Sequence, residues 1–150
     1  MTLRRLIYLS LILFVLACVS PALIVEDTFN SEIETWFGII LLTLGWLAVL
    51  VGELAWFANI FLITAWLLTF FKRLKTAFVF ALLACVSSLD VIRFNLLEIP
   101  ANEAGFCCFV LRQLSFGAYF WYASIFVFLL GLGFRLMQPQ ETDSTNRSST

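Results

Sequence analysis

The sequence predicts an all-α polytopic membrane protein with four transmembrane helices, arranged as two parallel two-helix repeats with short interfacial or re-entrant outer helices. Three observations predict this class. The chain of 150 residues is 62% hydrophobic and only 13% charged, and its mean hydropathy is +1.00, far from the usual balance of soluble domains. Its apolar runs are long enough to cross a bilayer. Its Lys and Arg residues fall in short clusters between those runs.

The first predicted span covers residues 6–25, a nearly unbroken apolar run preceded by Arg4 and Arg5. A helix needs about 20 residues to cross a hydrocarbon core, and this run has that length. The alternative is a cleaved signal peptide, with its apolar region over 6–19 and a cleavage site that uses Ser20 and Ala22. We expect the segment to be retained, because the repeat described below matches it to a span in the middle of the chain.

The second predicted span covers residues 53–71. An acidic segment over 26–34 precedes a mostly apolar stretch over 35–71, and the basic "KRLK" at Lys72–Lys75 follows it. Two crossings within 35–71 would leave the two basic clusters on opposite sides, although short loops rich in Lys and Arg tend to stay cytoplasmic. We therefore expect one crossing, with residues 36–52 as an interfacial or re-entrant helix on the outer side.

The last two predicted spans cover residues 76–94 and 117–137, joined by an outer loop. Both termini are then cytoplasmic, with most basic residues inside and most acidic loop residues outside. The prediction is one domain over 1–137, with repeat halves 4–71 and 72–137, and a polar, disordered tail over 138–150. The expected location is a cell membrane, crossed several times, and the inner membrane if the source is bacterial.

Two phrases of the sequence occur twice, which predicts the repeat. "GELAWFANIF" at Gly52–Phe61 is echoed by "GAYFWYASIF" at Gly117–Phe126, and "LACVS" at Leu16–Ser20 recurs at Leu83–Ser87. The two phrases occur in the same order in both halves, and the distance along the chain between the two copies is nearly the same for each phrase. This is typical of proteins built from one unit used twice. Each unit would start inside, cross outward and return. Chance recurrence of apolar letters is the alternative.

Polar residues near the outer ends of the spans form the candidate ligand site. Asn59 and Ser124 occupy equivalent places in the two phrases, so both are expected at an interior helix seam, where hydrogen bonds join helices. Charged side chains near a span end are tolerated mainly when they are paired or face water. A salt-bridge network that closes the outer end is one interpretation, and a vestibule for a small polar or charged ligand is the other. The candidate residues are Glu53, Asn59, Asp90, Arg93, Arg112 and Ser124.

The Trp and Tyr residues are interpreted as an aromatic belt at the membrane surfaces; a stacked ligand cage is the alternative, but it has no supporting polar pattern. The chain has no His, which excludes His-ligated metals and the commonest general base. It has no C-x-x-C pair, and the adjacent Cys107 and Cys108 could form a disulfide with each other or across chains on an oxidising side. We expect no cofactor, no metal and no catalytic residue. We expect no nucleic-acid partner, because the net charge is −1 and no basic tract is present.

The chain resembles a family of small uncharacterised bacterial four-helix membrane proteins. The resemblance rests on "GW" at Gly45, "AWFAN" at Ala55–Asn59, "NEAG" at Asn102–Gly105 and "FWYAS" at Phe120–Ser124. It brings no activity with it. The expected function is a non-enzymatic accessory or oligomeric component, with the lipid bilayer and a second copy or another membrane protein as partners. The alternatives are a small transporter or channel with an outer vestibule, and a membrane-perturbing, holin-like or defence effector.

Overall fold

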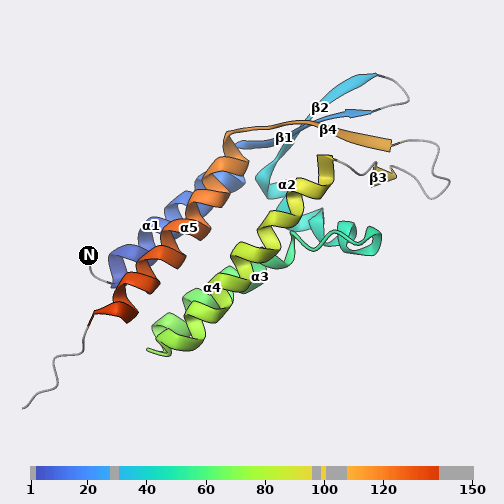
Figure 1. Cartoon of the computed structure of the whole chain (residues 1–150). Helices are drawn as coiled ribbons and strands as arrows, with labels where there is room; N and C mark the ends of the chain where they lie inside the picture. Colours follow the sequence, from blue (N-terminus) through green and yellow to red (C-terminus); the bar gives the residue numbers. More distant parts are fainter. Residues whose placement is uncertain (1–2, 28–30, 96–98, 101–107, 139–150) are drawn as a thin grey trace, which may run out of the picture.

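A computed structural model of the chain describes residues 3–27, 31–95, 99–100 and 108–138 (Figure 1). Its long helices lie alongside one another, and a small sheet lies at one end of them. The helices are α1 (Leu3–Val19), α2 (Gly38–Leu44), α3 (Phe57–Phe70), α4 (Leu74–Ser88) and α5 (Phe116–Met137), with 3₁₀ helices η1 (Gly45–Val51) and η2 (Leu89–Asn95). The strands are β1 (Pro21–Asp27), β2 (Glu32–Phe37), β3 (Ile99–Pro100) and β4 (Cys108–Leu114).

The fold is mixed α/β, so the prediction of an all-α protein is wrong. The four strands form one antiparallel sheet in the order β2-β1-β4-β3. Helix α1 ends at Val19 and strand β1 begins at Pro21, where the missing N–H of proline prevents the helical hydrogen bond. The apolar residues that follow Pro21 had been assigned to the first span. A short apolar run does not by itself distinguish a strand from the end of a helix.

The sheet has its own small hydrophobic core. Val25, in the middle of the central strand β1, is fully buried, and it packs with Ala22, Leu23 and Leu111. The pairing of β1 with β4 shifts between Ile24 and Val25, which pair with Gln113 and Leu111, so Arg112 is the extra residue of a bulge. Of the acidic segment at residues 26–34, residues 26–27 end β1 and residues 32–34 begin β2.

The two most extensive helix pairs each join one predicted half to the other. Helix α1 packs along α5, α3 packs along α4, and α4 also contacts α5. Small residues let the backbones approach closely. The fully buried alanines on α3 and α4 are Ala58, Ala65, Ala77, Ala81 and Ala84. The first half also inserts β2, α2 and η1 before its second long helix, so the architecture of two parallel two-helix repeats is wrong.

Among the described residues, two helical segments are long and apolar enough to cross a membrane, Leu74–Ile92 and Phe116–Met137. This is consistent with a membrane location, but it contradicts the prediction of a four-helix transmembrane bundle. Helix α1 has only 17 residues and α3 only 14. The first predicted span had included part of β1, and the second had included the turn before α3. Residues 36–52 were predicted as an interfacial or re-entrant helix. Of these, residues 36–37 end β2 and residues 38–51 form α2 and η1.

Two glycines bring the helices and the sheet into close contact. A Cβ atom on Gly38 would overlap the carbonyl oxygen of Ala17, and one on Gly117 would lie 2.8 Å from those of Ser20 and Pro21. The amide of Gly38 also donates to the Ser20 carbonyl at 3.1 Å. The starts of α2 and α5 are therefore both held against the backbone between α1 and β1.

Candidate functional site

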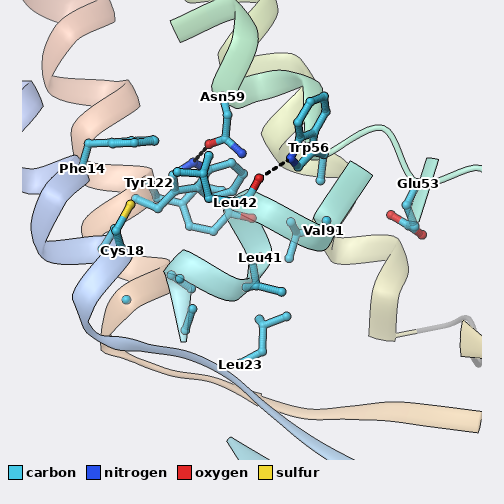
Figure 2. Close-up of a pocket in the computed structure, with 18 residues that line it drawn as sticks. Phe14, Cys18, Leu23, Leu41, Leu42, Glu53, Trp56, Asn59, Val91 and Tyr122 are labelled. Atoms are coloured by element: carbon cyan, nitrogen blue, oxygen red, sulfur yellow. Dashed lines mark hydrogen bonds between the residues drawn. The ribbon is translucent and has the colours of Figure 1, made fainter. Parts of the chain in front are cut away.

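A cavity of about 130 Å³ lies where the helices meet the sheet (Figure 2). Its walls come from the last turns of α1, the start of β1, helix α2, the segment before and at the start of α3, and the first turns of α5. Most of the lining is apolar, with Phe14 and Leu41 among the side chains. The close contacts at Gly38 and Gly117, which also line it, fix the relative positions of these walls.

Three of the aromatic residues that line the cavity are anchored by their polar atoms. Trp56 donates its indole N–H to the carbonyl of Leu42 at 2.9 Å, a bond drawn in Figure 2. Trp121 donates its N–H to Oδ1 of Asn59 at 2.8 Å. The Tyr122 hydroxyl donates to the carbonyl of Ser88 at 3.0 Å. Their polar hydrogens are therefore bonded to other atoms of the protein, and the three residues contribute their rings to the cavity walls.

Glu53 also lines the cavity, on the segment before α3, and its exposed fraction is 3%. It follows Gly52, whose φ of +89° is a left-handed conformation that glycine adopts without strain. The next residue, Leu54, donates its backbone N–H to Oδ2 of Asp90 at 2.6 Å. Asp90 thereby ties the turn that carries Glu53 to η2.

The predicted site residues do not form one site, and only some of them lie at the cavity. Glu53 and Asn59 line the cavity, and Asp90 supports the turn beside it. Ser124 is fully buried in the seam between α1 and α5, where it bonds Ser10.

The remaining predicted residues lie away from the cavity or beyond the description. Arg112 lies in β4 and forms an ion pair with Glu26 of β1. Arg93 belongs to η2, but its side chain is outside the described part of the structure. Cys107 is outside the described residues, and Cys108 begins β4 with its side chain likewise outside the description.

The sequence interpretation missed the aromatic side of the site. Trp56, Trp121 and Tyr122 were assigned to a membrane-surface belt, but all three line the cavity. Their places in the two echoed phrases, the first of which also carries Glu53 and Asn59, are the sequence signal that could have indicated a shared site. The walls from α1 and α2 had no such signal, because their lining residues are ordinary apolar ones.

The ion pair on the sheet has an electrostatic effect of its own. The hydrogen bond from Arg112 lowers the pKa of the Glu26 carboxyl below its ordinary value, and the positive charge of Arg112 adds to this effect. The same bond raises the pKa of Arg112. The Arg112 side chain is 61% exposed, so water screens the attraction. Within the described part of the chain, no three His, Cys, Asp or Glu side chains lie close enough to hold a metal ion.

The fold and the cavity define a class: a small mixed α/β protein in which apolar helices carry an antiparallel sheet and enclose a mostly apolar cavity at their junction with it. No family model matches the chain, and no match was found among curated proteins or solved structures.

Proposed function

We propose that the protein is a non-enzymatic integral membrane component, with the two long apolar helical segments Leu74–Ile92 and Phe116–Met137 crossing the bilayer and its sheet outside, where the sheet meets a protein partner or a second copy. The observation that carries this proposal is the separation of surface types along the molecule. Apolar side chains cover the helices, basic residues gather at one end, and acidic residues lie on the sheet at the other.

The apolar surface supports insertion of the helices in lipid. Large hydrophobic side chains on α4 and α5 are more than half exposed, among them Val79, Val86, Leu130 and Phe134. Soluble monomers rarely expose contiguous apolar areas of more than a few hundred Å². Lipid tails would cover this surface and remove it from water.

The charges support an orientation. The start of α1, the turn between α3 and α4, and the end of α5 lie together at the end of the helices away from the sheet (Figure 1). The basic residues of these segments are Arg4, Arg5, Lys72, Arg73, Lys75 and Arg135. Short segments rich in Lys and Arg tend to remain cytoplasmic. This end then lies in the cytoplasm, together with both ends of the chain, and the sheet lies outside.

The sheet supports an accessory role through its edge strand. Strand β2 has β1 on one side and is the last strand of the sheet on the other. Five of its six residues are exposed, including Ile33 and Phe37. An edge strand offers backbone N–H and C=O groups with which another chain can pair. A partner that adds a strand to β2 would cover this edge.

Site-directed labelling tests the orientation. In a chain whose four native cysteines are replaced by alanine, Glu32→Cys on β2 should react with a membrane-impermeant maleimide in intact cells. Thr76→Cys near the basic start of α4 should react only after the membrane is opened. The chain should also stay in the membrane pellet at alkaline pH. Release into the supernatant, or labelling of Thr76→Cys from outside, would contradict the proposal.

The cavity favours a second candidate function, a small transporter that accepts its solute near the outer face. Glu53 and Asn59 line a space next to the sheet, on the side proposed to face outward. Flux measurements in proteoliposomes decide between the candidates. Transport of a solute that stops with Glu53→Ala, in a variant that still folds, would favour the transporter, and no flux of any tested ion or solute would favour the accessory component.

A further inference from the structure

The cavity where the helices meet the sheet has the size of one small ring. Its volume is about 130 Å³, and in an unrelated protein an apolar cavity of about 150 Å³ binds benzene. Sites for small organic molecules are lined mainly by apolar and aromatic side chains, and most of the lining here is of that kind. The cavity therefore fits a ligand of one ring with at most a short substituent.

The polar hydrogens of three aromatic lining residues are already bonded within the protein. Trp56 and Tyr122 donate to backbone carbonyls, and Trp121 donates to Oδ1 of Asn59. A ligand hydroxyl or amine placed against these residues would lose its bonds to water without gaining new ones from them. What the three residues offer a ligand is their rings, against which another ring packs edge to face or in an offset stack.

The acidic side chain at the cavity does not favour a charged ligand. Among the described residues that line the cavity, Glu53 has the only charged side chain, and it is nearly fully buried. Glu53 has an interaction partner within the protein. A ligand cation would gain little from an acid that already has a partner, and it would have to leave water. An anion would be placed beside a second acid, so an uncharged ligand avoids both costs.

The walls of the cavity are fixed by contacts that need no ligand. Gly38 and Gly117 hold the starts of α2 and α5 against the backbone between α1 and β1. Asp90 of η2 accepts from the amide of Leu54 and so holds the turn before α3. Val91, the next residue of η2, is one of the lining residues drawn in Figure 2. A preformed cavity spares a ligand the cost of ordering its walls.

We propose that this cavity binds an uncharged molecule with a single hydrocarbon ring, which packs against the rings of Phe14, Trp56 and Trp121. The proposal goes beyond the membrane role given above and does not depend on it, because binding is measured on the purified full chain.

The test compares three probes that share one ring. Toluene, benzyl alcohol and benzylammonium are titrated into the full chain in a non-ionic detergent, and affinities are compared at the free aqueous concentration of each probe. Trp fluorescence and the midpoint of thermal unfolding are recorded, since a ligand of the folded state raises that midpoint. Toluene should saturate the site and bind about tenfold or more tightly than either polar probe, whose polar group loses its bonds to water. No saturable binding of toluene, or equal or tighter binding of a polar probe, would overturn the proposal.

Substitutions at Val91 place the ring in this cavity. Val91→Phe should fill part of the space and weaken binding of toluene about tenfold or more. Val86→Phe is the matched control, the same change at a side chain of α4 that is 59% exposed, and it should bind toluene like the native chain. Equal toluene binding in folded Val91→Phe and in the native chain would place the ring elsewhere and overturn the proposal.

A second substitution keeps the test decisive if Val91→Phe does not fold. Val91→Ala should enlarge the cavity and shift the preference of the site from toluene towards the bulkier isopropylbenzene. A folded Val91→Ala chain with the same preference as the native chain would also overturn the proposal.

Discussion

Ser10 of α1 and Ser124 of α5 each donate a hydrogen bond to the backbone carbonyl of the other, both at 2.9 Å. Both residues are fully buried. Trp66 of α3 donates its indole N–H to the Ser10 hydroxyl at 3.2 Å, so three helices meet at one polar cluster. The exchange is reciprocal, and each serine satisfies a group on the partner helix.

The first prediction is that these two serines are energetically coupled. Ser124→Ala should lower the free energy of unfolding by about 1 kcal/mol, and Ser10→Ala by about 1–3 kcal/mol, because it also removes the acceptor of the Trp66 N–H. The two hydroxyl oxygens also lie 3.1 Å apart, and either substitution removes this contact, so the double variant should cost less than the sum of the two. Denaturant unfolding in detergent measures this, with the exposed Thr76→Ala as a control that should change little. Strict additivity of the two effects would show that the serines act independently.

The second prediction concerns the glycines between helices and sheet. Gly38→Ala should destabilise the protein by about 1–3 kcal/mol, because the new methyl group would meet the Ala17 carbonyl and the backbone has to shift. Gly117→Ala should act in the same direction. Gly133→Ala is the matched control, since its methyl group would lie 3.5 Å from Phe78, an ordinary contact. There the higher helix propensity of alanine should leave stability equal or raised by up to about 1 kcal/mol. Thermal unfolding checks that Gly38→Ala and Gly117→Ala lower the melting temperature and that Gly133→Ala does not.

The helices could be located from the sequence, but the sheet could not. Hydropathy placed long helices at the positions of α1, α3, α4 and α5, because the apolar composition of a helix is a local property. Strand β1 continues the apolar run of α1, so composition shows no boundary between them. Its partner β4 lies more than eighty residues away, with Val25 opposite Leu111, and hydropathy contains no information on such a pairing. Arg112 also broke the apolar pattern that would indicate a strand.

The candidate site was predictable only where its residues are close in sequence. Glu53 and Asn59 were expected together and do line one cavity. Asn59 and Ser124 were expected to play equivalent parts, but Asn59 accepts from Trp121 whereas Ser124 bonds Ser10. The difference follows from the pairing of α1 with α5 and of α3 with α4, which the echoed phrases do not specify.

The third prediction concerns the bond between Asn59 and Trp121. Asn59→Leu should remove the acceptor of the partly buried indole N–H and cost about 1–3 kcal/mol. Trp121→Phe should lose the same bond from the other side, so the double variant should cost less than the two single effects added together. Trp46→Phe, at a ring that is 49% exposed, is the control. Thermal unfolding followed by circular dichroism measures all four variants, and a neutral Asn59→Leu would argue against the bond.

The last prediction is a pH dependence of the sheet. Arg112 holds the pKa of Glu26 below its ordinary value, so the charged carboxylate favours the folded state. This stabilisation is complete above the ordinary pKa of a glutamate and is lost as the pH falls through the lowered pKa of the folded state. The raised pKa of Arg112 also favours the folded state. That stabilisation is fully present below the ordinary arginine pKa, so it changes with pH only in strong alkali and not in acid. Glu26→Gln should therefore melt slightly below the native chain at neutral pH, and the two should converge in acid. The effect is small because the pair is solvated.

Melting curves recorded from neutral pH to strong acid test this prediction. In an Arg112→Gln background, Glu26→Gln should change the melting temperature less at neutral pH than it does in the native chain. If the melting temperature of Glu26→Gln were below that of the native chain by the same amount at every pH, the lower stability would have another cause than the titration of this carboxylate.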